Sequence, residues 1–595
     1  ALASVNLPSS LKEIGSNAFS GTNLKTIDFS TAPELSVIGY RAFMGTGITE
    51  VTLPYVCELG SDVFGNNVVN VTVAVAGEIT SLDFLGGTKG KLQSLTLTGE
   101  KETWIADGKN YRDALLSPDL IADNFTLTFN QGMTRIGNYA FYDLPDDKTK
   151  TLTVVFNEGL TEIGTNTFYE VNFSALELPD TLKSMDSAFS NAAIAGDVVL
   201  PDGLESVSNT FNGATVGSLT VNSGLVTIGT HAFYVKAPED GSTCVTVPEA
   251  FPNLTSIGLS AFNGSTVVWR ETLTLGSEQS GVAVDKFNTG SYGPVNLIAY
   301  VSSVEEGAFA NEAVQTIKVI GVGDNVTVGK NATSNMTALT QLTFENIASF
   351  GGYMVRSDNK LTKVTLGAGV KEIGDSMFSG LVAGAEVDIQ STDITRIGDQ
   401  AFYESNITSF TIGEKVESIG SWAFAKTPNL TTVVNSSAVL KTIGDYAFYQ
   451  SAIRSFTINE TVESIGAWAF AETSSLSTVT NNSAVLKTIG DQAFYRSMIT
   501  SFTIGETVES IGAYAFASNS ALTSVTNNST ALKSIGNYAF MSTSITSFEL
   551  NEGLETIGKQ AFRNTKIGEI ELPSSLTSVG DSIFYGNATT VPVPF

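Results

Sequence analysis

Residues that could perform acid–base or metal chemistry are sparse in this chain. Its single histidine, His231, precedes an Ala-Phe pair at a position where related segments hold Gln, Tyr or Asn. Asp399, Asp445 and Asp491 follow Ile-Gly once in every second repeat, whereas Ca²⁺ needs six or more oxygens gathered together. The sequence contains no Gly-rich phosphate loop, zinc-ligand pattern or nucleophile elbow. We therefore predict a protein that is not an enzyme and has no metal or cofactor, with these aspartates as solvated turn residues.

Asparagines in Asn-x-Ser/Thr sequons are frequent candidates for covalent modification. In a secreted eukaryotic protein they would carry N-linked glycans, and in a bacterial protein they would be turn residues. Asn435, Asn481 and Asn527 lie 46 residues apart, and we expect them at one edge of a sheet, which glycans would shield. The candidate N-glycosylation sites are Asn70, Asn124, Asn172, Asn253, Asn263, Asn325, Asn331, Asn335, Asn406, Asn429, Asn435, Asn459, Asn481, Asn527, Asn528 and Asn587.

Serines and threonines recur at the exposed positions of the strands that we expect late in the chain. Small β-compatible residues suit any open sheet face, so one interpretation is structural. Another is a flat, uncharged surface that docks a glycan or another protein. A third is ordering of water, as in ice-binding proteins, which the Ser, Val and Glu in these rows disfavour. The candidate binding ladder is Ser409, Thr411, Thr432, Ser455, Thr457, Thr478, Thr480, Ser501, Thr503, Ser524, Thr526 and Ser547.

Aromatic residues occupy the position just before Ala-Phe in several late repeats. They are Trp422, Tyr446, Trp468, Tyr514 and Tyr538. These rings could pack between neighbouring coils, or they could stack on sugars or on a partner chain.

The two cysteines, Cys57 and Cys244, are separated by about eight repeats. Stacked strands advance about 4.8 Å per repeat, which places them roughly 40 Å apart. A disulfide needs Cα atoms within about 7 Å, so we expect no bridge between them within one chain. We expect two small buried apolar residues, with an intermolecular bridge as the alternative.

A short sequence motif, I-G-x-x-A-F, recurs along the chain, and the fold that it specifies must position the candidate residues described above. It is densest late in the chain, where its start points differ by 22 or 24 residues. A fixed period of this length indicates a solenoid. A solenoid presents an extended surface, and this indicates a role in binding, spacing or assembly rather than in catalysis.

Each repeat contains a period-2 segment followed by a return leg. In Leu24–Phe29, Ile27 and Phe29 alternate with polar residues, which predicts a half-buried strand. We expect the strands to stack in parallel into one long sheet, with the Ala-Phe piece as a short helical turn and Gly allowing a tight bend. The Phe of the motif should form a buried column: Phe402, Phe424, Phe448, Phe470, Phe494, Phe516, Phe540 and Phe562.

The pattern L-P-x-x-L-x-x-I-G-x-x-A-F followed by L-x-x-I-x-L resembles the BspA-like leucine-rich repeats. Leu7–Phe19 fits it almost residue for residue, and Leu572–Phe584 fits with Ile in place of Ala. The resemblance implies a right-handed leucine-rich-repeat superhelix with one long parallel β-sheet and short helical or irregular return legs. It also implies an adhesin-like or matrix-binding protein on or outside cells, without catalytic motifs.

Regularity varies along what we expect to be one continuous solenoid. We predict leucine-rich repeats over residues 1–85, degenerate or inserted coils over 86–130, and repeats again over 131–262. Degenerate coils follow over 263–361 and the most regular repeats over 362–595. In the last block a pattern recurs after 46 residues, one short plus one long coil. Recent duplication in pairs explains this pitch, and a partner or chain-to-chain contact that needs a regular spacing is the alternative.

Composition limits the partners. The net charge is −28, with 60 acidic and 32 basic residues, so nucleic acid and anionic membranes would be repelled. Only 15% of the residues are charged, and such a polar, weakly charged surface suits an extracellular protein. No run of 18 apolar residues exists, so no transmembrane helix is expected.

We therefore expect a non-enzymatic extracellular or cell-surface protein for adhesion or for protein or glycan recognition. The alternative is a structural subunit that stacks end to end with further copies of itself into a fibre or coat, possibly glycosylated. The chain begins inside a repeat, at Leu2–Pro8. We accordingly expect either further chain upstream or another molecule that covers this end.

Overall fold

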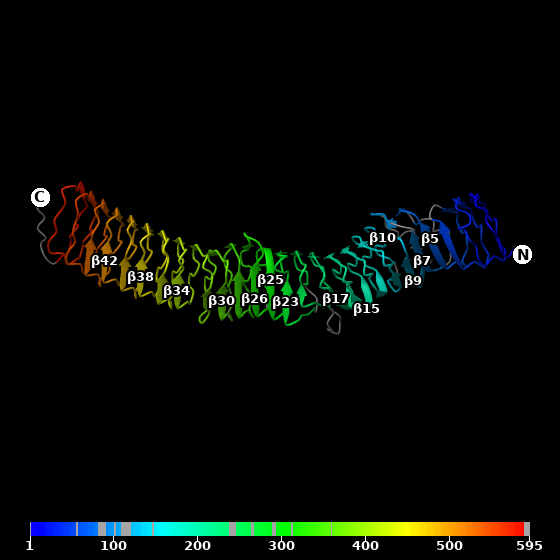
Figure 1. Ribbon diagram of the computed structural model, residues 1–595, viewed down its shortest axis with the longest axis horizontal. Helices are drawn as coiled ribbons and strands as arrows, with labels where there is room; N and C mark the ends of the chain where they lie inside the picture. Colours follow the sequence, from blue (N-terminus) through cyan, green and yellow to red (C-terminus); the bar gives the residue numbers. More distant parts are fainter. Residues whose placement is uncertain are drawn as a thin grey trace. The chain divides into compact units, whose positions relative to one another are not determined.

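The computed structural model describes residues 2–54, 57–80, 82, 91–99, 103–108, 121–144, 148–236, 245–262, 267–287, 293–310, 313–356, 358 and 360–587. The chain forms two compact units, residues 1–295 and residues 296–595. In each unit the chain winds as a β-solenoid in which strands of successive coils pair in parallel (Figure 1). Within these described ranges every regular element is a strand, and no helix could cross a bilayer.

The first unit contains one ten-stranded parallel sheet on one side of its coils. In spatial order its strands are β3 (Glu50–Pro54), β5 (Asn70–Val75), β7 (Leu92–Gly99), β9 (Ile121–Phe129), β11 (Thr151–Val155), β13 (Asn172–Leu176), β15 (Ala193–Val199), β17 (Thr215–Thr220), β19 (Val245–Thr246) and β22 (Val267–Val268).

Shorter strands in the return legs of the same unit also pair in parallel. They are β1 (Glu13–Ile14), β2 (Val37–Ile38) and β4 (Glu58–Leu59) in one strip, then β6 (Glu78–Ile79), β8 (Thr103–Ile105), β10 (Met133–Ile136), β12 (Glu162–Ile163), β14 (Ser184–Asp186), β16 (Ser206–Ser208), β18 (Thr227–Ile228), β21 (Ser256–Ile257) and β24 (Val282–Val284) in another. Beside them β20 (Ala250–Phe251) pairs with β23 (Thr272–Leu275).

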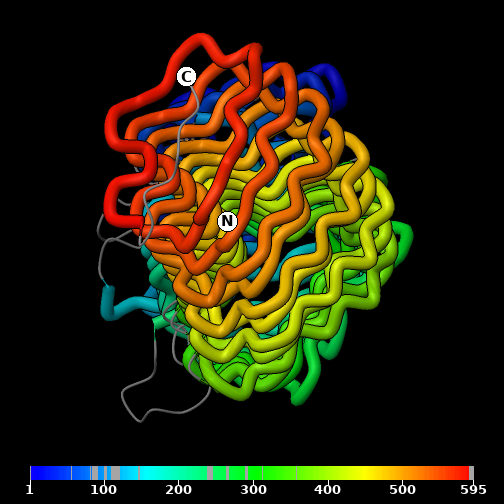
Figure 2. The backbone as a smooth tube through the Cα atoms, turned by 90° about the vertical axis from the view of Figure 1, so that its left-hand side faces the viewer, coloured from blue at the N-terminus to red at the C-terminus, as the bar shows by residue number. Residues whose placement is uncertain are grey.

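The second unit repeats this design, and its successive coils stack one behind the other as the chain winds (Figure 2). Its broad sheet begins with β25 (Asn296–Val304), β26 (Thr316–Gly321), β28 (Gln341–Glu345), β30 (Lys363–Leu366) and β32 (Glu386–Ile389). It continues as three hydrogen-bonded pairs: β34 (Ser409–Ile412) with β36 (Thr432–Asn435), β38 (Ser455–Ile458) with β40 (Thr478–Asn481), and β42 (Ser501–Ile504) with β44 (Ser524–Asn527).

The return legs of the second unit carry two-residue strands. β27 (Thr327–Val328) pairs with β29 (Ser349–Phe350). A ten-stranded strip follows: β31 (Glu372–Ile373), β33 (Arg396–Ile397), β35 (Ser418–Ile419), β37 (Thr442–Ile443), β39 (Ser464–Ile465), β41 (Thr488–Ile489), β43 (Ser510–Ile511), β45 (Ser534–Ile535), β46 (Thr556–Ile557) and β47 (Ser578–Val579). The predicted parallel leucine-rich-repeat solenoid is thus confirmed within each unit.

The return legs contain hydrogen-bonded turns where the sequence suggested a short helical turn. The Ala423 N–H donates to the Gly420 carbonyl within the same coil at 3.4 Å. The Phe424 N–H instead donates to the Ala447 carbonyl of the next coil at 2.7 Å. Because alternate amides bond to the neighbouring coil, a helix cannot continue. Trp422, between them, has a φ of 60°, the left-handed conformation that bulky residues rarely adopt.

The glycine of the motif is required by close approach to the preceding coil, and the left-handed bend lies two residues after it. A Cβ placed on Gly444 would lie 2.7 Å from the Gly420 carbonyl carbon and 2.7 Å from the Ser421 nitrogen. Any side chain here would push the coils apart.

The predicted Phe column is confirmed, and all eight rings are fully buried. Phe448 and Phe470 stack with centroids 5.1 Å apart, and Phe470 and Phe494 with centroids 5.2 Å apart. Phe456, from strand β38, packs at 5.1 Å against both Phe448 and Phe470. From Phe402 to Phe584 the core of the second unit is therefore a continuous stack of rings along the axis of the coils.

Candidate functional site

The predicted ladder residues come together on the exposed face of the strand pairs β34–β36, β38–β40 and β42–β44. The first strand of each pair is labelled in Figure 1. We call these twelve residues the Ser/Thr face. All of them are exposed except Thr457, which is half-buried. The cross-strand pairs on this surface are Ser409↔Thr432, Ser455↔Thr478, Ser501↔Ser524, Thr457↔Thr480, Thr503↔Thr526 and Thr411↔Val434, and Ser547 follows in the next coil.

The hydroxyl groups of the Ser/Thr face make no hydrogen bond to any other residue that the structure describes. The neighbouring row behaves differently: the Thr431 hydroxyl donates to the Thr408 carbonyl at 3.4 Å, and the Thr500 hydroxyl donates to the Ser477 carbonyl at 3.3 Å. The Ser/Thr face therefore keeps both its donors and its acceptors for solvent or a ligand.

The sequons at the edge of this face act as hydrogen-bonded links between coils, which we call Asn-x-Ser staples. The Asn481 Nδ2 donates forward to the Thr503 carbonyl at 3.0 Å, and its Oδ1 accepts from the Ser483 N–H at 3.1 Å. The Ser483 hydroxyl donates back to the Val462 carbonyl at 2.6 Å. One tripeptide thus joins three coils, and the sequons at Asn435 and Asn527 do the same.

The staples recur with the 46-residue spacing of the late repeats, once in every two coils. Each staple bridges the junction between one strand pair and the next, where the backbone ladder is interrupted. Sequence reasoning found the asparagines but not the buried serines Ser437, Ser483 and Ser529, although the shared 46-residue spacing was a signal for both.

The other candidate sequons lie in varied surroundings. Asn459 donates both amide hydrogens, to the Asn435 and Ser437 carbonyls. The exposed members are Asn124, Asn253, Asn325, Asn335, Asn429 and Asn528; the half-buried ones are Asn70, Asn172, Asn331, Asn406, Asn435, Asn459, Asn481 and Asn587; Asn527 is buried, and Asn263 lies outside the described residues.

The aromatic residues before Ala-Phe stack on one another from coil to coil. Trp422 and Tyr446 have centroids 4.2 Å apart and nearly parallel planes, as do Tyr514 and Tyr538 at 4.6 Å. The ring faces that meet in these stacks are therefore used within the protein. This arrangement agrees with packing between coils rather than with stacking on sugars.

The residues considered for catalysis and metal binding are dispersed. The Oδ1 atoms of Asp399, Asp445 and Asp491 accept the backbone N–H of Ser421, Ala467 and Ala513 in the next coil at 2.7, 2.6 and 2.7 Å. They are turn residues that cap the neighbouring coil. His231 contacts Tyr234 edge to face at 5.9 Å. In the described ranges, no three His, Cys, Asp or Glu residues gather as a metal site.

Cys57 is a buried free thiol, and Cys244 lies outside the described residues. Burial, with a smaller contribution from the Glu58 charge, raises the pKa of the Cys57 thiol to about 11. A thiol with such a pKa is protonated at neutral pH and reacts slowly.

Comparison with known proteins identifies the repeats. The family model described as BspA type leucine rich repeat region (6 copies) matches residues 1–84, 123–237, 242–354, 441–535 and 533–591, more than half of the chain. No curated protein matches significantly.

Three of the solved structures that match this chain come from bacteria. A leucine-rich repeat protein from Bacteroides ovatus ATCC 8483 is 16% identical, with a TM-score of 0.28, and the match covers 78% of this chain and 84% of that one. A leucine rich cell surface protein from Faecalibacterium prausnitzii A2-165 is 18% identical, with a TM-score of 0.25 and coverage of 50% and 89%. A leucine-rich repeat protein from Eubacterium ventriosum ATCC 27560 is 16% identical, with a TM-score of 0.27 and coverage of 81% and 92%. The family match, together with the repeat described above, shows that this chain belongs to the BspA-type leucine-rich repeat family.

Proposed function

We propose that this protein is a non-enzymatic extracellular surface protein that recognises another protein or a glycan through the Ser/Thr face. The observation that carries the proposal is the set of exposed hydroxyls without internal hydrogen bonds, repeated with a regular two-coil pitch. A ligand with hydroxyl or amide groups at a similar pitch could bond to several coils at once.

Charge and family support the same proposal. The Ser/Thr face itself carries no charged side chain, so binding there would depend on hydrogen bonds and shape more than on ion pairs. Membership of the BspA-type repeat family supports a proposed location on or outside the cell and a proposed adhesin-like role.

Arrays of glycans and extracellular matrix proteins, probed with the full chain, test this function. The double variant Thr478→Lys/Ser501→Lys places two long cations in the middle of the face and should reduce binding at least about tenfold through steric and desolvation costs. Thr488→Lys is the matched control, because Thr488 is an exposed threonine of β41, in the return leg. Equal losses in both variants, or none in the double variant, would exclude the Ser/Thr face.

End-to-end assembly into a fibre stays a prediction. Electron microscopy of the isolated protein tests it: fibres that repeat at the length of one chain would favour a structural subunit, and separate rods would favour recognition.

A further inference from the structure

The sheet of the second unit opens between β32 and β34. β32 pairs with β30 from Lys363↔Glu386 to Leu366↔Ile389, and β34 pairs with β36. In this stretch, all of which the structure describes, no backbone hydrogen bond joins β32 to β34. On one side of the opening the two coils are joined by a hydrogen bond from the Asn406 N–H to the Leu381 carbonyl. On the other side they are joined by an ion pair between Lys415 and Asp393. Both strands therefore present an unpaired edge to the opening.

The β32–β34 junction lacks an Asn-x-Ser staple, whereas at the next two junctions a staple bridges the interrupted backbone ladder. A shift of 46 residues aligns Ser391 with Ser437 and Ile389 with Asn435. Ser391 keeps its half of the staple, because its hydroxyl donates to the Val370 carbonyl at 2.6 Å. Ile389 has no side-chain amide to donate to the carbonyl of Thr411, whereas the Asn435 Nδ2 donates to the equivalent carbonyl of Thr457 at 3.0 Å.

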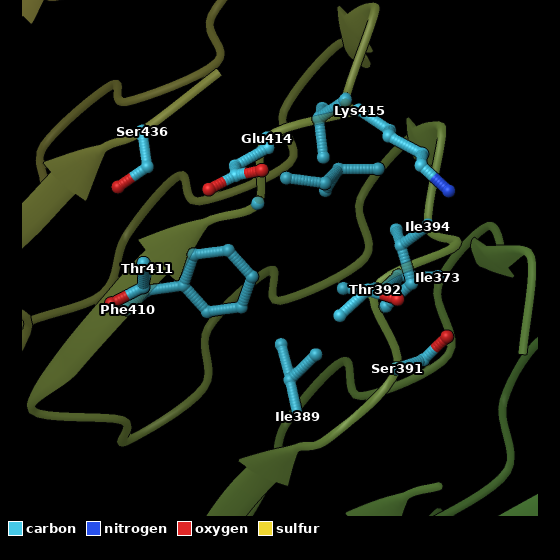
Figure 3. A pocket seen from close by; sticks show the side chains of 13 residues that line it. Ile373, Ile389, Ser391, Thr392, Ile394, Phe410, Thr411, Glu414, Lys415 and Ser436 are labelled. Atoms are coloured by element: carbon cyan, nitrogen blue, oxygen red, sulfur yellow. The ribbon is translucent and has the colours of Figure 1, made fainter. Parts of the chain in front are cut away.

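The opening leads into a pocket of about 510 Å³ (Figure 3). Ile389 and Phe410 project into it from the two strands. Ile389 is half-buried, although Leu366 and Ile412, at the matching position of the neighbouring strands, are fully buried. The apolar lining is Ile373, Ile389, Ile394, Ile397, Phe410 and Val416.

Charge is arranged unevenly at the pocket. Lys415 is neutralised by Asp393, with a distance of 2.8 Å between the ammonium and the carboxylate. Glu414, which also lines the pocket, has no ion pair with any described residue. A ligand that places an apolar group in the pocket should therefore bind more tightly if it also carries a positive charge that can lie beside Glu414.

We propose that this opening binds an extended segment of a partner polypeptide, with an apolar side chain in the pocket and a Lys or Arg beside Glu414. Extended peptides add to open strand edges through main-chain hydrogen bonds and place alternate side chains in pockets. Here the carbonyl that the missing staple leaves free, that of Thr411, would accept a peptide N–H. This site adjoins the Ser/Thr face at Thr411, whose carbonyl borders the opening and whose hydroxyl belongs to the face.

A strand of this same chain provides the probe. A fluorescently labelled peptide with the sequence of residues 454–459 carries Arg454, Phe456 and Ile458 in the required alternation. Fluorescence anisotropy with the full chain should show saturable binding that weakens as salt is added. A peptide with Glu in place of the Arg should bind at least about tenfold more weakly.

Two variants locate the binding. Ile389→Asn restores the staple and closes the opening, so affinity should fall at least about tenfold, while the thermal midpoint stays equal or rises. Glu414→Gln changes an exposed residue, keeps the fold and should weaken binding several-fold with a flatter salt dependence. The control Val434→Thr, at an exposed position of β36, should leave the affinity unchanged.

The proposal would be overturned if the Arg peptide did not bind, or if it bound the wild type, Ile389→Asn and Glu414→Gln with equal affinity. It would also be overturned if the pocket took up an apolar dye that the peptide did not displace. The double variant Thr478→Lys/Ser501→Lys should bind the peptide normally, so failure of the Ser/Thr face and failure of this pocket are distinguishable.

Discussion

Asn481 shows how a single side chain can hold two coils in register. The nitrogen and the oxygen of its side-chain amide are both hydrogen-bonded, and Asn481 is half-buried. The next residue, Asn482, is exposed, and among the described residues it bonds only through its backbone N–H, which donates to the Ile458 carbonyl. The two asparagines therefore provide a matched pair for measuring what a staple contributes.

We expect Asn481→Ala to lower the free energy of unfolding by about 1–3 kcal/mol, because the Thr503 carbonyl and the Ser483 N–H both lose a partner. Asn482→Ala should change it by less than about 0.5 kcal/mol. Urea unfolding of the two variants gives both values. Indistinguishable variants would mean that the staple is not a stabilising element.

A buried acid gives a prediction for pH. Asp358 is almost fully buried, and desolvation raises the pKa of its carboxyl to about 8, against 3.8 for an ordinary aspartate; the Met336 N–H, 2.7 Å from its Oδ1, only partly opposes this. Between pH 3.8 and about 8 the unfolded chain releases a proton that the folded chain keeps. The free energy of unfolding should therefore fall as the pH rises through this window.

Asp358→Asn keeps the acceptor for Met336 and cannot titrate. It should be more stable than the wild type at pH 8, with a smaller difference at pH 5. Urea unfolding at both pH values measures the difference in the free energy of unfolding between the variant and the wild type. The contributions of the other carboxylates are the same in both proteins and cancel in this difference. A difference that does not grow with pH would contradict the prediction.

At the scale of the element, the spacing between coils is set by the glycine of each return leg. A Cβ on Gly466 would lie 2.6 Å from the Asp445 nitrogen and 2.6 Å from the Gly444 carbonyl carbon, which belong to the preceding coil. Gly413, in the turn after β34, has nothing within 4 Å of such a Cβ. The two glycines thus occupy their positions for different reasons.

Gly466→Ala should destabilise the protein by about 1–3 kcal/mol, since the backbone of a neighbouring coil has to move. Gly413→Ala should be neutral or stabilising by up to about 1 kcal/mol, because only the unfolded chain is restricted. Thermal and urea unfolding compare them. A larger loss at Gly413 than at Gly466 would show that close approach between coils is not the constraint.

At the scale of the whole molecule, each coil bonds mainly to the coil before it and the coil after it. Stability in such a solenoid is approximately a sum over coils and nearest-neighbour interfaces. Damage to one coil should accordingly unfold a local group of coils first.

Phe470→Ala removes a ring stacked between Phe448 and Phe494 and should cost about 3–5 kcal/mol. Hydrogen exchange should show lost protection in β38–β43, while β25–β28 keep theirs. The exposed-site variant Val434→Ala is the control. A single sharp transition with the wild-type midpoint would contradict local unfolding.

The repeat, the alternating strands and the buried Phe column could be predicted from sequence because each is periodic, and a solenoid repeats its local contacts with the same period. The exposed hydroxyl ladder followed for the same reason. The family followed too, since its motif consists of the residues that this periodic core requires.

Only the tertiary structure decided the contacts made between coils. That Asn481 donates to Thr503, that Gly466 faces the Asp445 backbone and that Ile389 leaves the sheet open all depend on which atoms meet across a separation of about one coil. One-dimensional periodicity specifies which residues share a row but not which partners they meet. A single Ile in an Asn row therefore looks harmless in the sequence, yet in the fold it leaves the β32–β34 junction without the hydrogen bond that Asn435 and Asn481 supply at the next two junctions.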